Sequence, residues 1–231
     1  MSSENILTGE ETEKNSINGR IKYPRTPHLP FSPGISSDDD VIETLEYIKN
    51  SYIVVTEKMD GENITIYNDG FHARSLDGRH HHSRDWLANF HSSYIMNNIP
   101  KNWRICGEYL YAKHSILYEN LPSYFLGFSI WNDQNICLSW DETTEWFSLL
   151  NIHPVPVLYT GPFDEEKIKN ISNSLDYEKC EGFVIRKYDQ FHYNDFNKFV
   201  CKYVRKNHVQ TDKNWKYKKI TKNSLSSEMK K

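Results

Sequence analysis

The 231-residue sequence lacks a strong charge of one sign, a long apolar run and a leader-like N-terminus. Its 28 lysine and arginine residues are nearly balanced by 31 aspartate and glutamate residues, so any nucleic-acid partner would have to be held by a local basic groove. Without an apolar run of membrane-spanning length we expect no membrane partner, and the polar N-terminus predicts a protein that is not secreted. We therefore expect an intracellular protein.

Cysteine is also scarce, and the few that occur do not have the paired spacing of a metal site. The four are Cys106, Cys137, Cys180 and Cys201. Cys106 and Cys201 fall in predicted strands and Cys180 directly precedes one, so we expect reduced, buried thiols with a structural role. The run His80-His81-His82 and the later His91 have no cysteine partner or paired spacing either, and a loop is the better interpretation of this segment.

Length and composition predict one folded domain with a polar segment at each end. Residues 1–20 are rich in Ser, Asn and Glu, which predicts a flexible N-terminal segment. Four prolines between residues 23 and 34 force an extended path near the start of the folded domain, residues 21–210. Residues 211–231 form a basic tail with interleaved aromatic residues, which resembles a phosphate-binding segment but fits a solvated chain end equally well.

Hydrophobic periodicity predicts more strands than helices. Strands rich in β-branched and aromatic residues are expected at 52–58, 62–68, 71–75, 103–111, 123–131, 181–187 and 198–204. Helices are expected at 38–50, 82–96, 143–150 and 164–175, and an extended piece at 155–159. Because the helices do not alternate regularly with the strands, the sequence predicts an α+β fold with antiparallel sheets.

The pentapeptide Glu57-Lys58-Met59-Asp60-Gly61 lies between the first two of these strands. Its Asp-Gly pair is typical of a tight hairpin turn, because Gly adopts a positive φ at little cost. Lys58 stands at the end of a core strand, where an unpaired ammonium is expensive to bury. Taken alone, the segment is more simply interpreted as a surface lysine at a hairpin tip, and only the segments that follow favour a function.

Six short segments resemble, in order, motifs I, Ia, III, IIIa, IV and V of the covalent nucleotidyltransferases, the superfamily of polynucleotide ligases and mRNA capping enzymes. They are Lys58-Met59-Asp60-Gly61, Ala73-Arg74-Ser75, Gly107-Glu108-Tyr109, Phe125-Leu126-Gly127-Phe128, Glu181-Gly182-Phe183-Val184 and Val200-Cys201-Lys202-Tyr203-Val204-Arg205. One such motif is a weak match, but six in order are specific. The resemblance implies a nucleotidyltransferase (adenylation) domain, in which two antiparallel sheets are flanked by helices.

Two residues near the lysine point to one group within that superfamily. DNA ligases usually carry Arg near the position of Asn63, whereas enzymes of the RNA ligase 2 type carry Asn there and Glu at the position of Glu57. The sequence therefore resembles the ATP-dependent RNA ligases. This resemblance implies joining of 3′-hydroxyl and 5′-phosphate RNA ends through a lysyl-AMP intermediate and an adenylated 5′ end, with ATP and Mg²⁺ or Mn²⁺.

The resemblance also assigns roles to the matching residues. The expected catalytic residues are Lys58 as nucleophile, together with Asp60, Glu181 and Lys202. Asp60 and Glu181 are also the expected metal ligands, since a divalent cation offsets charge in an in-line displacement at phosphorus. The expected nucleotide-binding residues are Glu57, Asn63, Arg74, Glu108, Phe128, Lys202 and Arg205.

Within that nucleotide-binding set, Glu57 is expected at the adenine edge, and Arg74 and Glu108 at the ribose. Phe128 is expected to stack on the purine. The sequence departs from the family pattern after Lys202, because Val204 occupies the place of a second lysine and Arg205 follows one residue later. In a regular strand Lys202 and Arg205 would point to opposite faces.

Phosphates of the RNA are expected to meet Arg79 and Arg84, in the loop that follows Arg74, since Arg binds phosphate in a bidentate manner. Only about 30 residues follow the last motif, so we expect a monomer that relies on a partner chain for extra grip on nucleic acid or acts on a narrow substrate. Two alternatives stay open from the sequence. One is a DNA ligase-like nick sealer, and the other is a catalytically idle RNA-binding module of the same fold.

Overall fold

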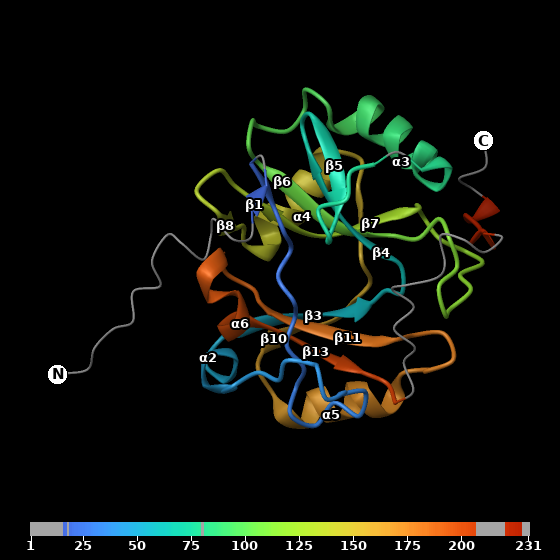
Figure 1. The fold of residues 1–231 in the computed structure, drawn as a ribbon. Helices are drawn as coiled ribbons and strands as arrows, with labels where there is room; N and C mark the ends of the chain where they lie inside the picture. The colour runs from blue at the N-terminus through green and yellow to red at the C-terminus, as the bar shows by residue number, and fades with distance from the viewer. Residues whose placement is uncertain (1–15, 18, 80, 207–219, 228–231) are drawn as a thin grey trace.

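The computed structural model describes residues 16–17, 19–79, 81–206 and 220–227, and its elements follow one another irregularly along the chain (Figure 1). The strands are β1 (Ser16–Ile17), β2 (Arg20–Ile21), β3 (Tyr52–Lys58), β4 (Glu62–Tyr67), β5 (Gly70–Ala73), β6 (Arg104–Tyr109), β7 (Phe125–Trp131), β8 (Ile136–Cys137), β9 (His153–Pro154), β10 (Val157–Pro162), β11 (Gly182–Lys187), β12 (Phe191–His192) and β13 (Val200–Val204). The helical segments are α2 (Glu46–Lys49), η1 (His82–Arg84), α3 (Asp85–Phe90), η2 (His91–Ile95), α4 (Trp140–Leu149), α5 (Glu165–Ser174), η3 (Tyr193–Asp195) and α6 (Phe196–Phe199). The flexible segment expected at 1–20 and the basic tail expected at 211–231 lie largely outside the described residues.

Four strands form the lower sheet of Figure 1, in the order β10-β3-β11-β13, with every neighbouring pair antiparallel. One face of this sheet packs on α5, where Ile53 and Val55 of β3 and Phe183 and Ile185 of β11 surround Ile168. These strand residues alternate in sequence, so the residues between them point to the opposite, inner face.

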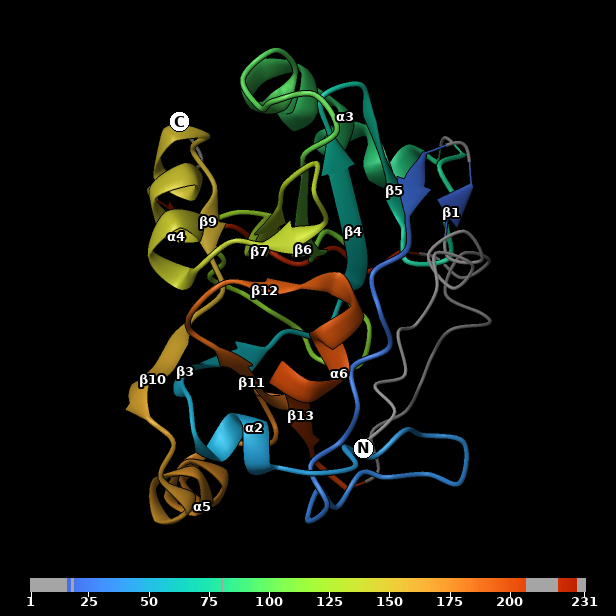
Figure 2. The ribbon, with the colours of Figure 1, turned by 90° about the vertical axis from the view of Figure 1, so that its left-hand side faces the viewer.

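The upper sheet has the order β12-β8-β7-β6-β4-β5, and β9 pairs with β7. All its pairs are antiparallel except β7 with β9. Its outer face carries α3 and α4 (Figures 1 and 2), whose Leu87, Phe90 and Phe147 pack against Ile64 and Ile105 of the strands. The predicted α+β class, with antiparallel sheets flanked by helices, is confirmed.

A third cluster of buried residues joins the inner faces of the two sheets. It contains Cys106 and Trp131 of the upper sheet, Val200 of the lower sheet and Phe196 of α6. All four cysteines of the chain are buried and free, which confirms the prediction of reduced structural thiols. Within the described residues, no helix has the length and apolar character needed to cross a membrane.

The two longest helices begin where the sequence provides a capping side chain. The Asp164 carboxylate accepts the N–H groups of Glu166 and Lys167, so α5 begins as predicted. In α4, Ser139 and Glu142 form a reciprocal capping box. This box makes α4 begin at Trp140, three residues before the predicted start.

The helix predicted at 38–50 is wrong for most of its length, because only α2 is helical there. The backbone before α2 pairs instead with His28. The His28 N–H donates to the Asp40 carbonyl at 2.7 Å, and the Ile42 N–H donates to the His28 carbonyl at 2.9 Å. The Asp39 carboxylate is engaged by Arg25 and Ser36. These tertiary contacts outweigh a helical pattern that the sequence carries locally.

The hairpin predicted at Asp60-Gly61 is also wrong, because β3 and β4 belong to different sheets. The segment crosses from the lower sheet to the upper one. The Gly61 φ is not positive, and glycine is required for close approach instead: a Cβ at Gly61 would lie 2.5 Å from the Tyr109 carbonyl oxygen. The pentapeptide is therefore the junction between the two layers.

Candidate active site

A cleft of about 920 Å³ lies between the inner faces of the two sheets. Strand register gives its lower wall: Thr56 is paired with Val184, and Val184 with Lys202, so the three side chains form a row across β3, β11 and β13. Lys58 continues the same face of β3 and ends at the junction between the layers. Alternation along three short strands thus brings two lysines, 144 positions apart in sequence (202 − 58), to one surface.

The upper wall is formed by β4, β6 and β7. Asn63 is paired with Glu108, which places both on the inner face. Phe128 lines the cleft at a β-bulge, because Cys106 pairs with Ser129 while the next residue, Gly107, already pairs with Gly127. The extra residue breaks the simple alternation expected along β7.

Lys58 and Glu181 form an ion pair inside this cleft, with 2.6 Å between Nζ and Oε2. Glu181 is almost fully buried directly before β11, and Lys58 is mostly buried. Burial acts to lower the pKa of Lys58, but the carboxylates of Glu181, Glu108 and Asp60 raise it above its ordinary value. Lys58 is therefore an ammonium at neutral pH.

Glu108 is held close to the same junction, where its Oε1 accepts the Gly61 N–H at 3.1 Å. Burial raises the pKa of Glu108 to about 8, and the negative charges of Glu181 and Asp60 add to this effect while Lys58 opposes it. Glu108 is therefore mostly protonated near neutral pH, beside the Lys58–Glu181 ion pair.

Lys202 is the second cation of the cleft floor. Burial and the charge of Lys58 lower the pKa of Lys202 to about 8. Its backbone pairs with the proline-rich stretch that contains Pro27 and Leu29. The Leu29 N–H donates to the Lys202 carbonyl at 2.8 Å, and the Lys202 N–H donates to the Pro27 carbonyl at 2.9 Å. Residues 22–28 thereby become a wall of the cleft.

Sequence reasoning missed the cleft residues contributed by that wall. Tyr23 packs edge-to-face on Phe128, with 5.2 Å between ring centroids. Arg25 lines the cleft and is held by Asp39, with 3.0 Å between the guanidinium and the carboxylate. Hydrogen bonds from Ser36 and the charge of Lys202 outweigh burial and lower the pKa of Asp39 to about 2. Only the alternation of basic residues with prolines at 22–30 could have drawn attention to this segment.

Asp60 lines the cleft, and its carboxylate is also tied to a neighbouring loop. Oδ2 accepts the Ser115 N–H and hydroxyl, both at 2.7 Å, and the Ile116 N–H at 2.8 Å. Arg205 reaches the outer side of this arrangement, with its guanidinium 3.5 Å from Ser115 Oγ and bonded to the Tyr177 carbonyl. Of the predicted site residues, all but Arg205 line the cleft.

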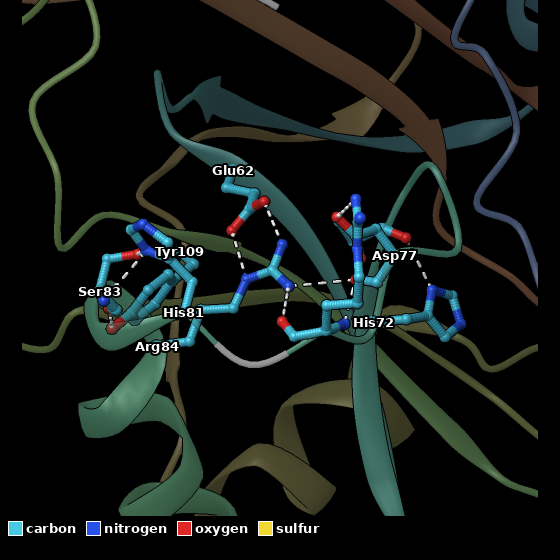
Figure 3. A network of polar contacts seen from close by, with 9 residues as sticks. Glu62, His72, Asp77, His81, Ser83, Arg84 and Tyr109 are labelled. Atoms are coloured by element: carbon cyan, nitrogen blue, oxygen red, sulfur yellow. Dashed lines mark hydrogen bonds and ion pairs between the residues drawn. The ribbon is translucent and has the colours of Figure 1, made fainter. Parts of the chain in front are cut away.

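The loop between β5 and α3 corrects one prediction (Figure 3). Arg84 is buried rather than available to phosphates, and its guanidinium bonds the Glu62 carboxylate and the carbonyls of Asp77 and Arg79. Arg79 is highly exposed beside Asp77 and keeps its predicted role as a proposal. Arg84 thus organises the loop that follows Arg74, another residue of the cleft wall.

The donor set of the cleft fits a divalent cation bound together with nucleotide phosphates. In the described ranges no three His, Cys, Asp or Glu side chains are arranged to hold a metal by themselves. Glu181 and Asp60 both line the cleft, and Mg²⁺ is usually held by one or two carboxylates with phosphates and waters. The pKa of Glu108 is raised first by burial and then by the charges of Glu181 and Asp60, and a cation held by these two carboxylates would offset their effect.

A model of the RNA ligase family matches residues 51–204. That stretch is more than half of the chain and contains Lys58, Glu108, Glu181 and Lys202. The chain belongs to the RNA ligase family. No curated protein matches the sequence.

Solved structures of RNA ligases have a similar fold. An RNA ligase of Naegleria gruberi solved with ATP and manganese matches at 21% identity and a TM-score of 0.53, over 80% of this chain and 62% of that one. An archaeal ATP-dependent RNA ligase matches at 16% identity and a TM-score of 0.56, over 80% of this chain and 48% of that one. The family member described here spans between about half and three-fifths of the length of these structures and has their nucleotidyltransferase fold.

Proposed function

We propose that this protein is an ATP-dependent RNA ligase that joins 3′-hydroxyl and 5′-phosphate RNA ends through a lysyl-AMP intermediate and an adenylated 5′ end. The observation that carries the proposal is Lys58, an ion-paired lysine among three carboxylates at the junction of two sheets. Its setting is that of a nucleophile whose charge is controlled by its neighbours.

In the first step, Lys58 Nζ forms a bond to the α-phosphorus of ATP, the bond to the bridging oxygen breaks, and pyrophosphate leaves. The ammonium must pass a proton to Glu181, whose Oε2 lies 2.6 Å away, or to water before it can attack, and the charges of the surrounding carboxylates disfavour that loss. A divalent cation held by Glu181 and Asp60 would offset phosphate charge and compete with the ammonium for these carboxylates. Nucleotide binding would thus activate the nucleophile.

The nucleotide is bound by the two walls together in this proposal. Phe128 stacks on the adenine, whose edge faces Glu57, and Arg74 and Glu108 hold the ribose. Asn63 Oδ1 supports a polar ligand here, because it is buried and accepts no hydrogen bond from the described residues. Lys202 offsets charge at the reacting phosphorus.

In the later steps AMP passes from Lys58 to the 5′-phosphate of RNA, and the 3′-hydroxyl then displaces AMP. The reduced cysteines support an intracellular setting. We further propose that the chain acts as a monomer, with or without a partner chain that adds grip on the RNA. The Glu57 and Asn63 pattern favours RNA over a DNA nick, and the assembled Lys58, Glu181 and Lys202 cluster argues against a catalytically idle module.

The test is covalent labelling of the purified protein with α-labelled ATP and Mg²⁺ or Mn²⁺. We expect a labelled adduct that survives denaturation in the wild type and is lost by at least a hundredfold in Lys58→Ala. Lys179→Ala is the matched control, because this lysine is highly exposed outside the cleft, and its adduct should form at the wild-type level.

Two outcomes would contradict the proposal. Equal labelling of Lys58→Ala and wild type would place the nucleophile elsewhere. A wild-type protein that forms no adduct with either ATP or GTP would favour the idle RNA-binding module.

A further inference from the structure

Residues 220–227, here called the clasp, lie against residues 110–124, here called the bridging loop. The contacts are of the backbone type that holds strands together. The Lys113 N–H donates to the Thr221 carbonyl at 2.8 Å, the Ser224 N–H to the Tyr118 carbonyl at 2.9 Å, and the Leu121 N–H to the Ser224 carbonyl at 3.0 Å. The clasp therefore extends the fold beyond the last motif.

Asn223 is the centre of this contact and is 1% exposed. Its Nδ2 donates to the Leu110 carbonyl at 2.8 Å, and its Oδ1 accepts the Tyr118 N–H at 2.9 Å. Its carbonyl accepts the Tyr124 hydroxyl at 3.1 Å. A buried amide bonded at both ends fixes the bridging loop at two points, which an apolar side chain could not do.

The opposite side of the bridging loop holds residues 58–61, here called the nucleophile loop. The Tyr118 hydroxyl accepts the Asp60 N–H at 3.0 Å. Ser115 and Ile116 together donate three hydrogen bonds to the Asp60 carboxylate. Tyr118 is thus bonded to Asn223 through its backbone and to the nucleophile loop through its side chain.

We propose that the clasp positions the nucleophile loop through the bridging loop, and that Asn223 is the positioning residue. The inference rests on the proposed function, since it assigns the clasp an effect on transfer of AMP to Lys58. The physical reason is that a reacting group must be held to within a fraction of an ångström, and small displacements reduce rates by large factors. Asn223 contacts no reacting atom.

The first measurement is single-turnover adenylation of the full chain carrying Asn223→Ala, with Ser224→Ala as the matched control. Ser224 is exposed and contributes only backbone bonds. We expect a tenfold to hundredfold slower rate in Asn223→Ala with less than a threefold change in the ATP concentration at half-maximal rate. A change confined to that ATP concentration would overturn the inference.

The second measurement is hydrogen exchange at Ser115 and Ile116, which does not depend on activity. Their N–H groups should exchange at least tenfold faster in Asn223→Ala, while amides of α5 are unchanged. Unchanged exchange at both residues would overturn the inference. If the wild type formed no adduct, the proposed function would fail, and exchange would still decide whether the clasp holds the loop.

A second variant guards against a general loss of folding in Asn223→Ala. Tyr118→Phe removes only the hydroxyl that accepts the Asp60 N–H and keeps the backbone bonds to the clasp. We expect it to slow adenylation in the same manner. The double variant should be no slower than the slower single variant, because both act through one connection, and strictly additive losses would contradict that connection.

Discussion

At the scale of single residues, the cleft brings several titratable groups close to one lysine. Lys58 is paired with Glu181, yet Glu108 and Asp60 lie near the same ammonium. Glu108 responds with a pKa raised to about 8 by burial and by the other carboxylates. A carboxyl whose pKa differs between the folded and unfolded states makes the free energy of unfolding depend on pH, and the direction of the pKa shift gives the sign of that dependence.

Glu108→Gln tests this charge balance. The pKa of Glu108 rises from its ordinary value of 4.5 to about 8 on folding, so the folded state binds more protons between these values. Its contribution to the free energy of unfolding is therefore present at low pH and lost as pH rises through that window. Glutamine keeps the acceptor for the Gly61 N–H and carries no charge. We expect the free energy of unfolding of Glu108→Gln to rise by about 1–2 kcal/mol relative to wild type as the pH is raised from about 5 to about 8. This is less than the full value of about 1.4 kcal/mol per pKa unit, because water in the cleft screens the carboxyl.

Urea unfolding of both proteins across this pH range measures the difference. A difference that stays constant with pH would show that Glu108 keeps its ordinary pKa in the folded state. Comparison of two nearly isosteric proteins removes the contributions of titrating groups far from Glu108, because they are shared.

The sequence could predict the site residues whose chemistry lies in short contiguous motifs. Lys58, Glu108, Glu181 and Lys202 were each found from a motif, and all line the cleft. Asn223 could not be found in this way, because its partner Leu110 is 113 positions away and no local pattern marks either. The prediction for Arg84 is wrong for the same reason: its burial depends on Glu62 of β4, 22 positions earlier in the sequence.

At the scale of elements, local patterns succeeded where a segment's own side chains decide its structure. The Asp164 cap predicted the start of α5. The helix predicted at 38–50 and the hairpin at Asp60-Gly61 failed because tertiary partners decide those segments, namely His28 in the first case and Tyr109 and Glu108 in the second. Short polar connections are thus the least predictable elements here, and these two segments contribute Asp39 and Asp60 to a cleft whose walls are otherwise mainly strands.

The ion pair of Arg84 and Glu62 stabilises the loop between β5 and α3 (Figure 3). Their side chains are 3% and 13% exposed, so removal of one partner leaves the other charge buried. We expect Arg84→Met to lower the free energy of unfolding by about 3–5 kcal/mol. Adding Glu62→Gln to Arg84→Met should recover part of that loss, since the uncompensated carboxylate is then gone.

Arg79→Met is the matched control in the same loop, because the Arg79 side chain is 88% exposed. Exposed ion pairs contribute about 0–1 kcal/mol, so this variant should unfold almost as the wild type does in urea. The interpretation of Arg84 as a buried structural cation would be wrong if both arginine variants were equally mild.

At the scale of the whole molecule, two sheets meet through one buried cluster and leave a cleft between them. The two-sheet arrangement was predicted from the resemblance, not from hydrophobic periodicity, which gives strands but not their partners. The clasp shows that residues 220–227, which follow the last motif, are part of the folded domain. Deleting the chain after Val209 would therefore remove both the basic residues and the clasp. A loss of activity in that variant could not be assigned either to weaker RNA binding or to a displaced nucleophile loop.

The RNA assignment is best tested with charge substitutions that keep the clasp. Proteins distinguish RNA from DNA through the 2′-hydroxyl and A-form shape. We therefore expect nicks with a ribose 3′-hydroxyl terminus to be sealed at least tenfold faster than all-DNA nicks.

Replacing Lys216, Lys218 and Lys219 by Gln should slow sealing at subsaturating RNA. It should also reduce the slope of log rate against log salt by roughly 1–3, since each phosphate contact contributes about 0.7–0.9 to that slope. Adenylation should stay at the wild-type level in this variant. Equal sealing of RNA-terminated and all-DNA nicks would overturn the RNA assignment, and an unchanged salt slope would remove these lysines from the binding surface.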